Sequence, residues 1–146
     1  MRLQSSRIMM FVLIGVLFLS VSSVYAETAQ EYLRKGRSYF LVGNPTQAIS
    51  NFTKAIEIDP NYVDAYYNRG RAYLNQGNFA QAISDYTKAI AINPNDAMAY
   101  YDRGLACFMI KEYDNAWVDV HKAESLGYHI NPDFLQNLKK ASGKDK

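Results

Sequence analysis

The chain has 146 residues, 16 Lys and Arg against 14 Asp and Glu, and a single cysteine. One cysteine excludes an internal disulfide framework, and a charge balance this close to zero gives no reason to expect a nucleic-acid partner. The sequence contains no nucleophile elbow, phosphate-binding loop or metal-ligand spacing, so we expect no enzyme, no cofactor and no metal site.

Residues 1–26 have the pattern of a secretory signal peptide. Arg2 and Arg7 precede an apolar stretch over residues 8–21, and Val24-Tyr25-Ala26 places small residues at both positions that a signal peptidase reads. The apolar stretch is shorter than the roughly 20 residues of a comfortable membrane span. We predict cleavage after Ala26 and an exported protein, periplasmic in a bacterial envelope or secreted. The alternative is that the signal peptide is not cleaved, in which case it anchors the protein to the membrane.

Apolar residues at helical spacing, separated by Gly, Pro and Asn turn signals, predict seven helices after this segment. Thr28 and Glu31 form the capping box of the first helix. Asn44, Asn61, Asn78 and Asn95 are expected to cap the next four helices. The predicted helices lie at about 28–41, 45–58, 62–75, 79–92, 96–109, 113–125 and 132–141.

Small residues recur with a period of 34, which is typical of stacked helical hairpins. They divide the chain into repeats over residues 29–62, 63–96 and 97–130, each with a first helix A and a second helix B, and residues 131–146 follow as a capping helix with a polar tail. Small side chains at fixed phases let the paired helices approach closely. The positions are Gly36, Gly70 and Gly104, then Ala48, Ala82 and Ala116, and finally Ala55, Ala89 and Ala123.

The middle repeat carries the family signature. The segment from Tyr66 to Tyr73, the segment from Asn78 to Ile83, and Tyr86-Thr87-Lys88-Ala89-Ile90 with Asn93-Pro94 resemble the idealised tetratricopeptide repeat. The resemblance implies an all-α, right-handed solenoid of three helical hairpins plus a C-terminal capping helix. It also implies a non-enzymatic protein-interaction scaffold that binds a protein or peptide partner.

The third repeat departs from the pattern. Lys111 stands where Gly43 and Gly77 mark the turn between helices A and B, so we expect a strained or reshaped turn. Cys107 replaces a core tyrosine and is interpreted as a packing residue. His121 is expected to be a partly buried structural histidine, because a soft metal site with Cys107 lacks the three or four ligands that metals need.

In this family the A helices line the concave surface, and the resemblance carries ligand-facing phases onto this chain. The set is apolar and aromatic with two guanidinium groups, which favours a peptide with apolar anchors and an acidic group. It comprises Leu33, Arg37, Phe40, Asp64, Tyr67, Arg71, Leu74, Met98, Tyr101, Leu105 and Phe108, together with Gln30, Leu41, Asn75 and Met109.

Four alternatives to a peptide groove remain open from the sequence. The exposed aromatic residues can mediate self-association into a homo-oligomer, or the chain can be a passive spacer. Phe108 and Met109 can pack against the C-terminal helix, and the two arginines can pair with neighbouring carboxylates.

A carboxylate clamp is a known feature of chaperone-binding members of the family. Its Lys-Asn-Asn-Lys-Arg set falls here on Leu33, Arg37, Asn68, Met98 and Asp102, of which only Asn68 fits. Asp102 would repel a carboxylate, so we expect no such clamp.

Overall fold

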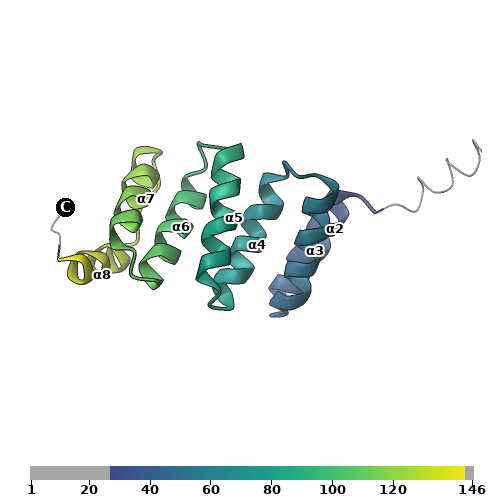
Figure 1. Cartoon of the computed structure of the whole chain (residues 1–146), viewed down its shortest axis with the longest axis horizontal. Coiled ribbons are helices and arrows are strands. Elements are labelled where there is room, and N and C mark those ends of the chain that lie inside the picture. Colours follow the sequence, from purple (N-terminus) through teal and green to yellow (C-terminus); the bar gives the residue numbers. More distant parts are fainter. Residues whose placement is uncertain (1–26, 144–146) are drawn as a thin grey trace, which may run out of the picture.

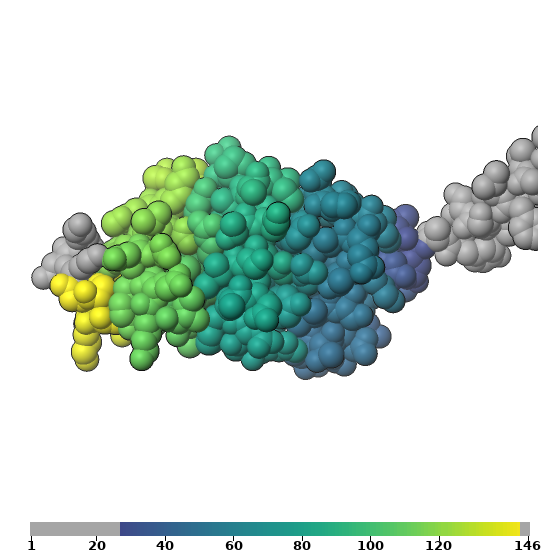
Figure 2. All heavy atoms as spheres, in the orientation of Figure 1, coloured from purple at the N-terminus to yellow at the C-terminus, as the bar shows by residue number. Residues whose placement is uncertain are grey.

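The computed structural model describes residues 27–143, and the predicted signal peptide lies outside them. Within the described residues seven helices follow one another in chain order along the long axis of an elongated molecule (Figures 1 and 2). No helix in this range is long and apolar enough to cross a membrane. The bounds are α2 Ala29–Leu41, α3 Pro45–Ile58, α4 Val63–Asn75, α5 Phe79–Ile92, α6 Ala97–Met109, α7 Tyr113–Ser125 and α8 Pro132–Ser142.

The helices pair as the period predicts. The densest packing joins α2 with α3, α4 with α5 and α6 with α7, and each B helix also contacts the A helix of the next repeat. The A helices α2, α4 and α6 further touch one another in sequence. This gives an all-α helical repeat fold in which one row of A helices lies against one row of B helices.

The small residues at the helix pairs are buried as expected. All six alanines of the two repeated phases are completely buried. A Cβ atom at Gly36 would lie 2.4 Å from the Phe52 ring, and one at Gly70 would lie 2.8 Å from the Tyr86 ring. At Gly104 the nearest atom, Cβ of Asp119, is 3.2 Å away. In the first two repeats, therefore, the glycine makes room for an aromatic ring of the paired helix.

The predicted caps are confirmed at some helix starts and wrong at others. Thr28 and Glu31 form the reciprocal capping box, and the Asn44 side chain accepts a hydrogen bond from the backbone of Gln47. Asn78 stands at the start of α5, but its side chain bonds Gln76 instead of the helix. Asn61 and Asn95 lie one residue too early, inside the turns that follow the prolines. Tyr62 and Asp96 therefore occupy the cap positions of the next two helices.

The turn at Lys111 keeps the backbone shape of the other two turns, so of the two expected outcomes it is strained and not reshaped. Lys111 has a φ of 66°, close to the 75° of Gly43 and the 76° of Gly77. A side chain with a Cβ is disfavoured in this left-handed region, so the turn carries strain that the two glycine turns lack.

The capping helix α8 covers the end of the stack, as predicted. Phe134 and Leu138 are buried in a cluster with Cys107, Trp117 and Val120. The Trp117 indole donates a hydrogen bond to the hydroxyl of Ser142 at the end of α8. Repeat stacks need such a terminal element because each repeat otherwise leaves an apolar side open.

Tyr86 provides a test of core packing. It is completely buried, and its hydroxyl has no hydrogen-bond partner among residues 27–143. The equivalent positions of the other repeats carry Phe52 and Val120, which lack a hydroxyl. Because an unsatisfied buried hydroxyl is unfavourable, Tyr86→Phe is expected to leave the free energy of unfolding unchanged or raise it by about 1 kcal/mol, measured by urea denaturation at pH 7.

The same substitution should change the alkaline stability. Burial raises the pKa of Tyr86 far above its ordinary value of 10.0. Above about pH 10 the unfolded chain releases this proton while the native protein retains it, so native stability falls as pH rises. The advantage of Tyr86→Phe should therefore grow between pH 9 and 11 (~2 pH units around the ordinary pKa). A variant that is less stable than the parent at both ends of this range would contradict the packing argument.

Candidate functional site

A shallow hollow of about 380 Å³ lies on the row of A helices. Helices α2 and α4 supply most of its walls, and the start of α6 closes one side. Seven of the predicted groove residues line it. The complete lining is Arg37, Phe40, Leu41, Asp64, Tyr67, Asn68, Arg71, Asp96 and Met98. We call this hollow the A-helix groove.

Arg37 is already paired within the protein. One of its terminal nitrogens (Nη2) donates a hydrogen bond to Oδ2 of Asp64 at 2.9 Å, which ties α2 to α4. Both side chains are about half exposed, so the pair is accessible to solvent. Pairing with a neighbouring carboxylate was the alternative to a ligand contact, and Arg37 adopts it.

Arg71 has a different environment. Its guanidinium lies 5.2 Å from the ring centre of Phe40 and 6.0 Å from that of Tyr67, within range of cation–π contact with both. Among residues 27–143 it makes no hydrogen bond or ion pair with a carboxylate. The two rings orient the guanidinium while its N–H groups stay available.

Tyr67 and Asp102 connect α4 to α6 at the floor of the groove. The tyrosine hydroxyl donates to Oδ2 of Asp102 at 2.9 Å. Burial is the main cause that raises the pKa of Tyr67, and the nearby Asp102 charge and hydrogen bond raise it further. Burial also raises the pKa of Asp102, against the opposing effects of the Tyr67 hydrogen bond and the Arg71 charge. Asp102 is thus committed to an internal contact.

Eight predicted groove residues lie elsewhere. Gln30, Asn75 and Met109 are exposed but do not line the groove, and neighbouring helices cover the other five. Leu33 is buried in the core of the first repeat, and Leu74 packs against the core cluster around Tyr86. The capping helix takes the rest: Leu105, Tyr101 and Phe108 pack in the cluster that contains Phe134 of α8. The groove is therefore shorter than the three-repeat surface that the resemblance implied.

Asp96 is a groove residue that the family phases did not include. Its carboxylate caps α6 by accepting hydrogen bonds from the backbone of Met98 and Ala99. An Asp directly before a helical pattern is a recognisable cap signal. The sequence analysis assigned the cap of this helix to Asn95, so Asp96 was not recognised.

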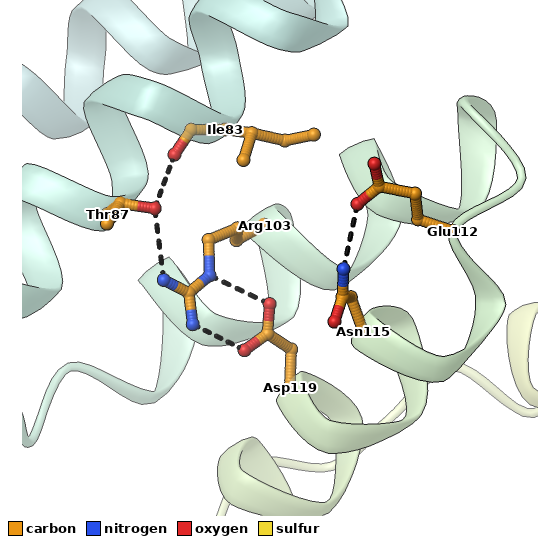
Figure 3. Close-up of polar contacts among 6 residues, drawn as sticks. All are labelled: Ile83, Thr87, Arg103, Glu112, Asn115 and Asp119. Carbon is orange, nitrogen blue, oxygen red and sulfur yellow. Dashed lines mark hydrogen bonds and ion pairs between the residues drawn. The ribbon is translucent and has the colours of Figure 1, made fainter.

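The opposite face, formed by the B helices, contains a repeated polar contact that the sequence reading missed. Arg103 of α6 donates two hydrogen bonds, of 2.8 and 2.7 Å, to Asp119 of α7, and a third to Thr87 of α5 (Figure 3). Arg69 makes the same contacts one repeat earlier, with Asp85 and Thr53. We call each set an Arg-Asp staple. Each staple ties together three helices.

The signal for the staples was present in the 34-residue period. Arg, Asp and Thr each recur once at that spacing, whereas the first repeat has Lys35 and Asn51 at the Arg and Asp phases. Lys35 instead pairs with Glu27. Only contacts between helices show that the three recurring residues meet.

Titratable residues form no metal site in the part of the chain that the structure describes. No group of three His, Cys, Asp or Glu side chains is close enough to hold an ion. Cys107 is buried, as expected for a packing residue. His121 is exposed and lies against the Trp117 ring, so the expected partial burial of this histidine is wrong.

Comparisons with known proteins agree with this architecture. Two family models described as tetratricopeptide repeat match residues 63–96 and 85–117, and a third described as TPR repeat matches residues 36–77. A comparison with curated protein sequences found no match.

Several solved structures are similar over most of their length. The first TPR domain of Spaghetti (RPAP3), bound to the HSP90 peptide SRMEEVD, is 32% identical; the match covers 80% of this chain and 91% of that chain, with a TM-score of 0.72. The TPR domain of Arabidopsis OM64 is 27% identical over 77% of this chain and 94% of that one, with a TM-score of 0.72. The TPR2B domain of yeast Sti1, in complex with pHsp70, is 26% identical over 81% and 98%, with a TM-score of 0.70. The chain belongs to the tetratricopeptide repeat family.

Proposed function

We propose that this protein is a non-enzymatic interaction scaffold of the cell envelope that binds an extended or helical segment of a partner protein in the A-helix groove. The observation that carries the proposal is Arg71, an oriented guanidinium that makes no hydrogen bond or ion pair with a carboxylate among residues 27–143, beside exposed apolar side chains. Leu41 is 83% exposed and Met98 is 50% exposed. Together they offer contacts for an acidic group flanked by apolar residues.

Peptide binding by similar domains supports this class of function. The Spaghetti domain is described with a bound HSP90 peptide, and the Sti1 domain with pHsp70. The carboxylate clamp is nevertheless a poor match here. Leu33 is buried, Arg37 is paired with Asp64, and Asp102 accepts the Tyr67 hydrogen bond. We therefore propose a partner other than a chaperone C-terminus.

The binding test begins with a peptide selected from a display library on the protein. Arg71→Ala should weaken its affinity by about 10- to 150-fold, since a charge-assisted hydrogen bond contributes about 1.5–3 kcal/mol. Met98→Ser should also weaken it. Arg37→Ala should change affinity by less than about fivefold, because a surface pair contributes only about 0–1 kcal/mol. Fluorescence polarisation measures each affinity.

Lys88→Ala on the B-helix face is the matched control, because it removes an exposed charge far from the groove-lining set. Its affinity should equal that of the parent. Added salt should weaken binding to the parent, since part of the attraction is electrostatic. Equal affinity of the parent, Arg71→Ala and Met98→Ser would refute the groove as the binding site.

Export is the second part of the proposal. The capping box at Thr28 and Glu31 places the first helix of the folded domain directly after the predicted cleavage site. Intact-mass measurement of protein from the envelope fraction should find a chain that begins at Glu27. A full-length chain retained in the membrane would replace export with anchoring.

Self-association is less well supported than partner binding. The end of the stack at the first repeat carries a hollow of about 610 Å³, in which Val42 and Tyr39 are exposed as far as residues 27–143 are concerned. Arg34, Lys35 and Lys54 surround it against one carboxylate, Glu27. Two such faces would repel each other, while α8 covers the other end of the stack.

A further inference from the structure

A furrow of about 280 Å³ lies on the B-helix face of the third repeat. Residues of α5, α6 and α7 line it, and those drawn in Figure 3 are among them. It is separate from the A-helix groove and shares no residue with it. The lining is Ile83, Thr87, Arg103, Cys107, Glu112, Asn115, Val118 and Asp119.

The preceding repeat shows what normally occupies this place. Tyr73 stands 34 residues before Cys107 and follows Arg69 by the same four residues. It is half-buried, packs against the core cluster around Tyr86, and influences the pKa of Arg69 electrostatically. A tyrosine thus lies beside the staple in repeat 2, and repeat 3 lacks the ring.

The rim of the furrow changes in the same repeat. Val118 is 67% exposed, whereas the equivalent positions of the other repeats carry Ser50 and Ser84. This valine adds apolar area at the edge of the furrow, and covering that area with a bound apolar group would be favourable. Repeat 3 therefore combines a missing aromatic ring with a new apolar edge at the same furrow.

The walls suit a phenol. Arg103 has five N–H groups, of which three donate to Asp119 and Thr87, so two remain without a partner among residues 27–143. A phenol oxygen can accept a hydrogen bond from such a group. Burial raises the pKa of the Cys107 thiol to about 11, so this wall is neutral at physiological pH. The volume lies just below the usual range for small-molecule pockets and fits a single side chain.

We propose that this furrow is a second binding site, which takes one tyrosine side chain of a protein partner in the place that Tyr73 occupies in repeat 2. The inserted ring packs on Cys107 and Val118, and its hydroxyl faces the staple at Arg103. This site does not depend on the A-helix groove, so a partner can contact both faces of the stack.

The test uses N-acetyl-tyrosinamide as the probe and the protein purified after expression of the full-length chain. Amide NMR signals of Thr87, Cys107 and Asn115 should shift in a saturable way. Cys107→Tyr should lower the affinity at least about tenfold, because the new ring occupies the furrow from within. Cys107→Ser keeps the space open and should bind as the parent does. N-acetyl-leucinamide, which lacks the ring, should not shift these signals.

A second variant keeps the proposal testable if Cys107→Tyr does not fold. Val118→Asp changes an exposed side chain and should lower the affinity for N-acetyl-tyrosinamide, because it removes the apolar edge of the furrow. Equal affinity of the Val118→Asp variant would overturn the proposal, as would equal affinity of the folded Cys107→Tyr variant. Binding of free p-cresol without binding of N-acetyl-tyrosinamide would also overturn it, because the furrow would then exclude a side chain attached to a backbone.

Discussion

Gly70→Leu is expected to destabilise the protein by about 3 kcal/mol or more, at the upper end of overpacking effects. A Cβ at this position would already lie 2.8 Å from the Tyr86 ring, and that ring is completely buried with no space to move into. The larger side chain would separate α4 from α5 in the central repeat. Urea denaturation followed by circular dichroism measures the loss.

Substitution of alanine for each repeat glycine tests the same packing with a smaller side chain. The distances of 2.4, 2.8 and 3.2 Å predict that Gly36→Ala is most destabilising, Gly70→Ala intermediate and Gly104→Ala least. The higher helix propensity of alanine offsets about 1 kcal/mol of the destabilisation in each variant, so Gly104→Ala should be close to neutral. If Gly70→Ala is instead the most destabilising of the three, relaxation of the terminal repeats, and not local space, controls the result.

Removal of one carboxylate from an Arg-Asp staple should have the second large effect. Asp85→Ala leaves the Arg69 guanidinium without its bidentate partner, and the two side chains are only 17% and 6% exposed. Breaking a buried pair from one side typically destabilises a protein by about 3–5 kcal/mol, since the remaining charge is poorly solvated. Thermal and urea unfolding of Asp85→Ala should show a loss in this range.

Asp64→Ala is the matched control for the staple. Its pair with Arg37 joins two helices in the same way, but the side chains are 57% and 49% exposed. A surface pair of this kind contributes about 0–1 kcal/mol. If Asp64→Ala and Asp85→Ala destabilise the protein equally, burial of the staple is not the source of its strength.

The elements of the fold were predictable because they depend on local spacing. The 34-residue step of Gly36, Gly70 and Gly104 placed three hairpins, and the capping box at Thr28 and Glu31 placed the first helix start. Errors occurred where two residues compete for one role. Asn95 and Asp96 can each cap a helix, and the geometry of the turn after the proline decides in favour of Asp96.

The candidate site was predictable only in part. Family phases identified the side of each A helix that faces the groove, and so found Phe40, Tyr67 and Arg71. They did not show how far α8 reaches, so Tyr101 and Phe108 were included although Phe134 packs against both. Coverage by a terminal helix depends on its docking angle, which residue spacing does not contain.

The sequence alone determined the repeat length, the positions of the helices and the burial of the repeated alanines. It also showed that a capping helix follows the third repeat. Each of these results follows from periodicity and local backbone preference. The tertiary structure decided which of the two groove arginines forms an ion pair with a carboxylate. Arg37 meets Asp64 across 27 residues and Tyr67 meets Asp102 across 35, while Arg71 lies on two rings. Arg37 and Arg71 thus differ in role although they occupy equivalent positions of successive repeats. The relative offset of neighbouring A helices sets the partner of each side chain. The repeat period in the sequence does not specify that offset.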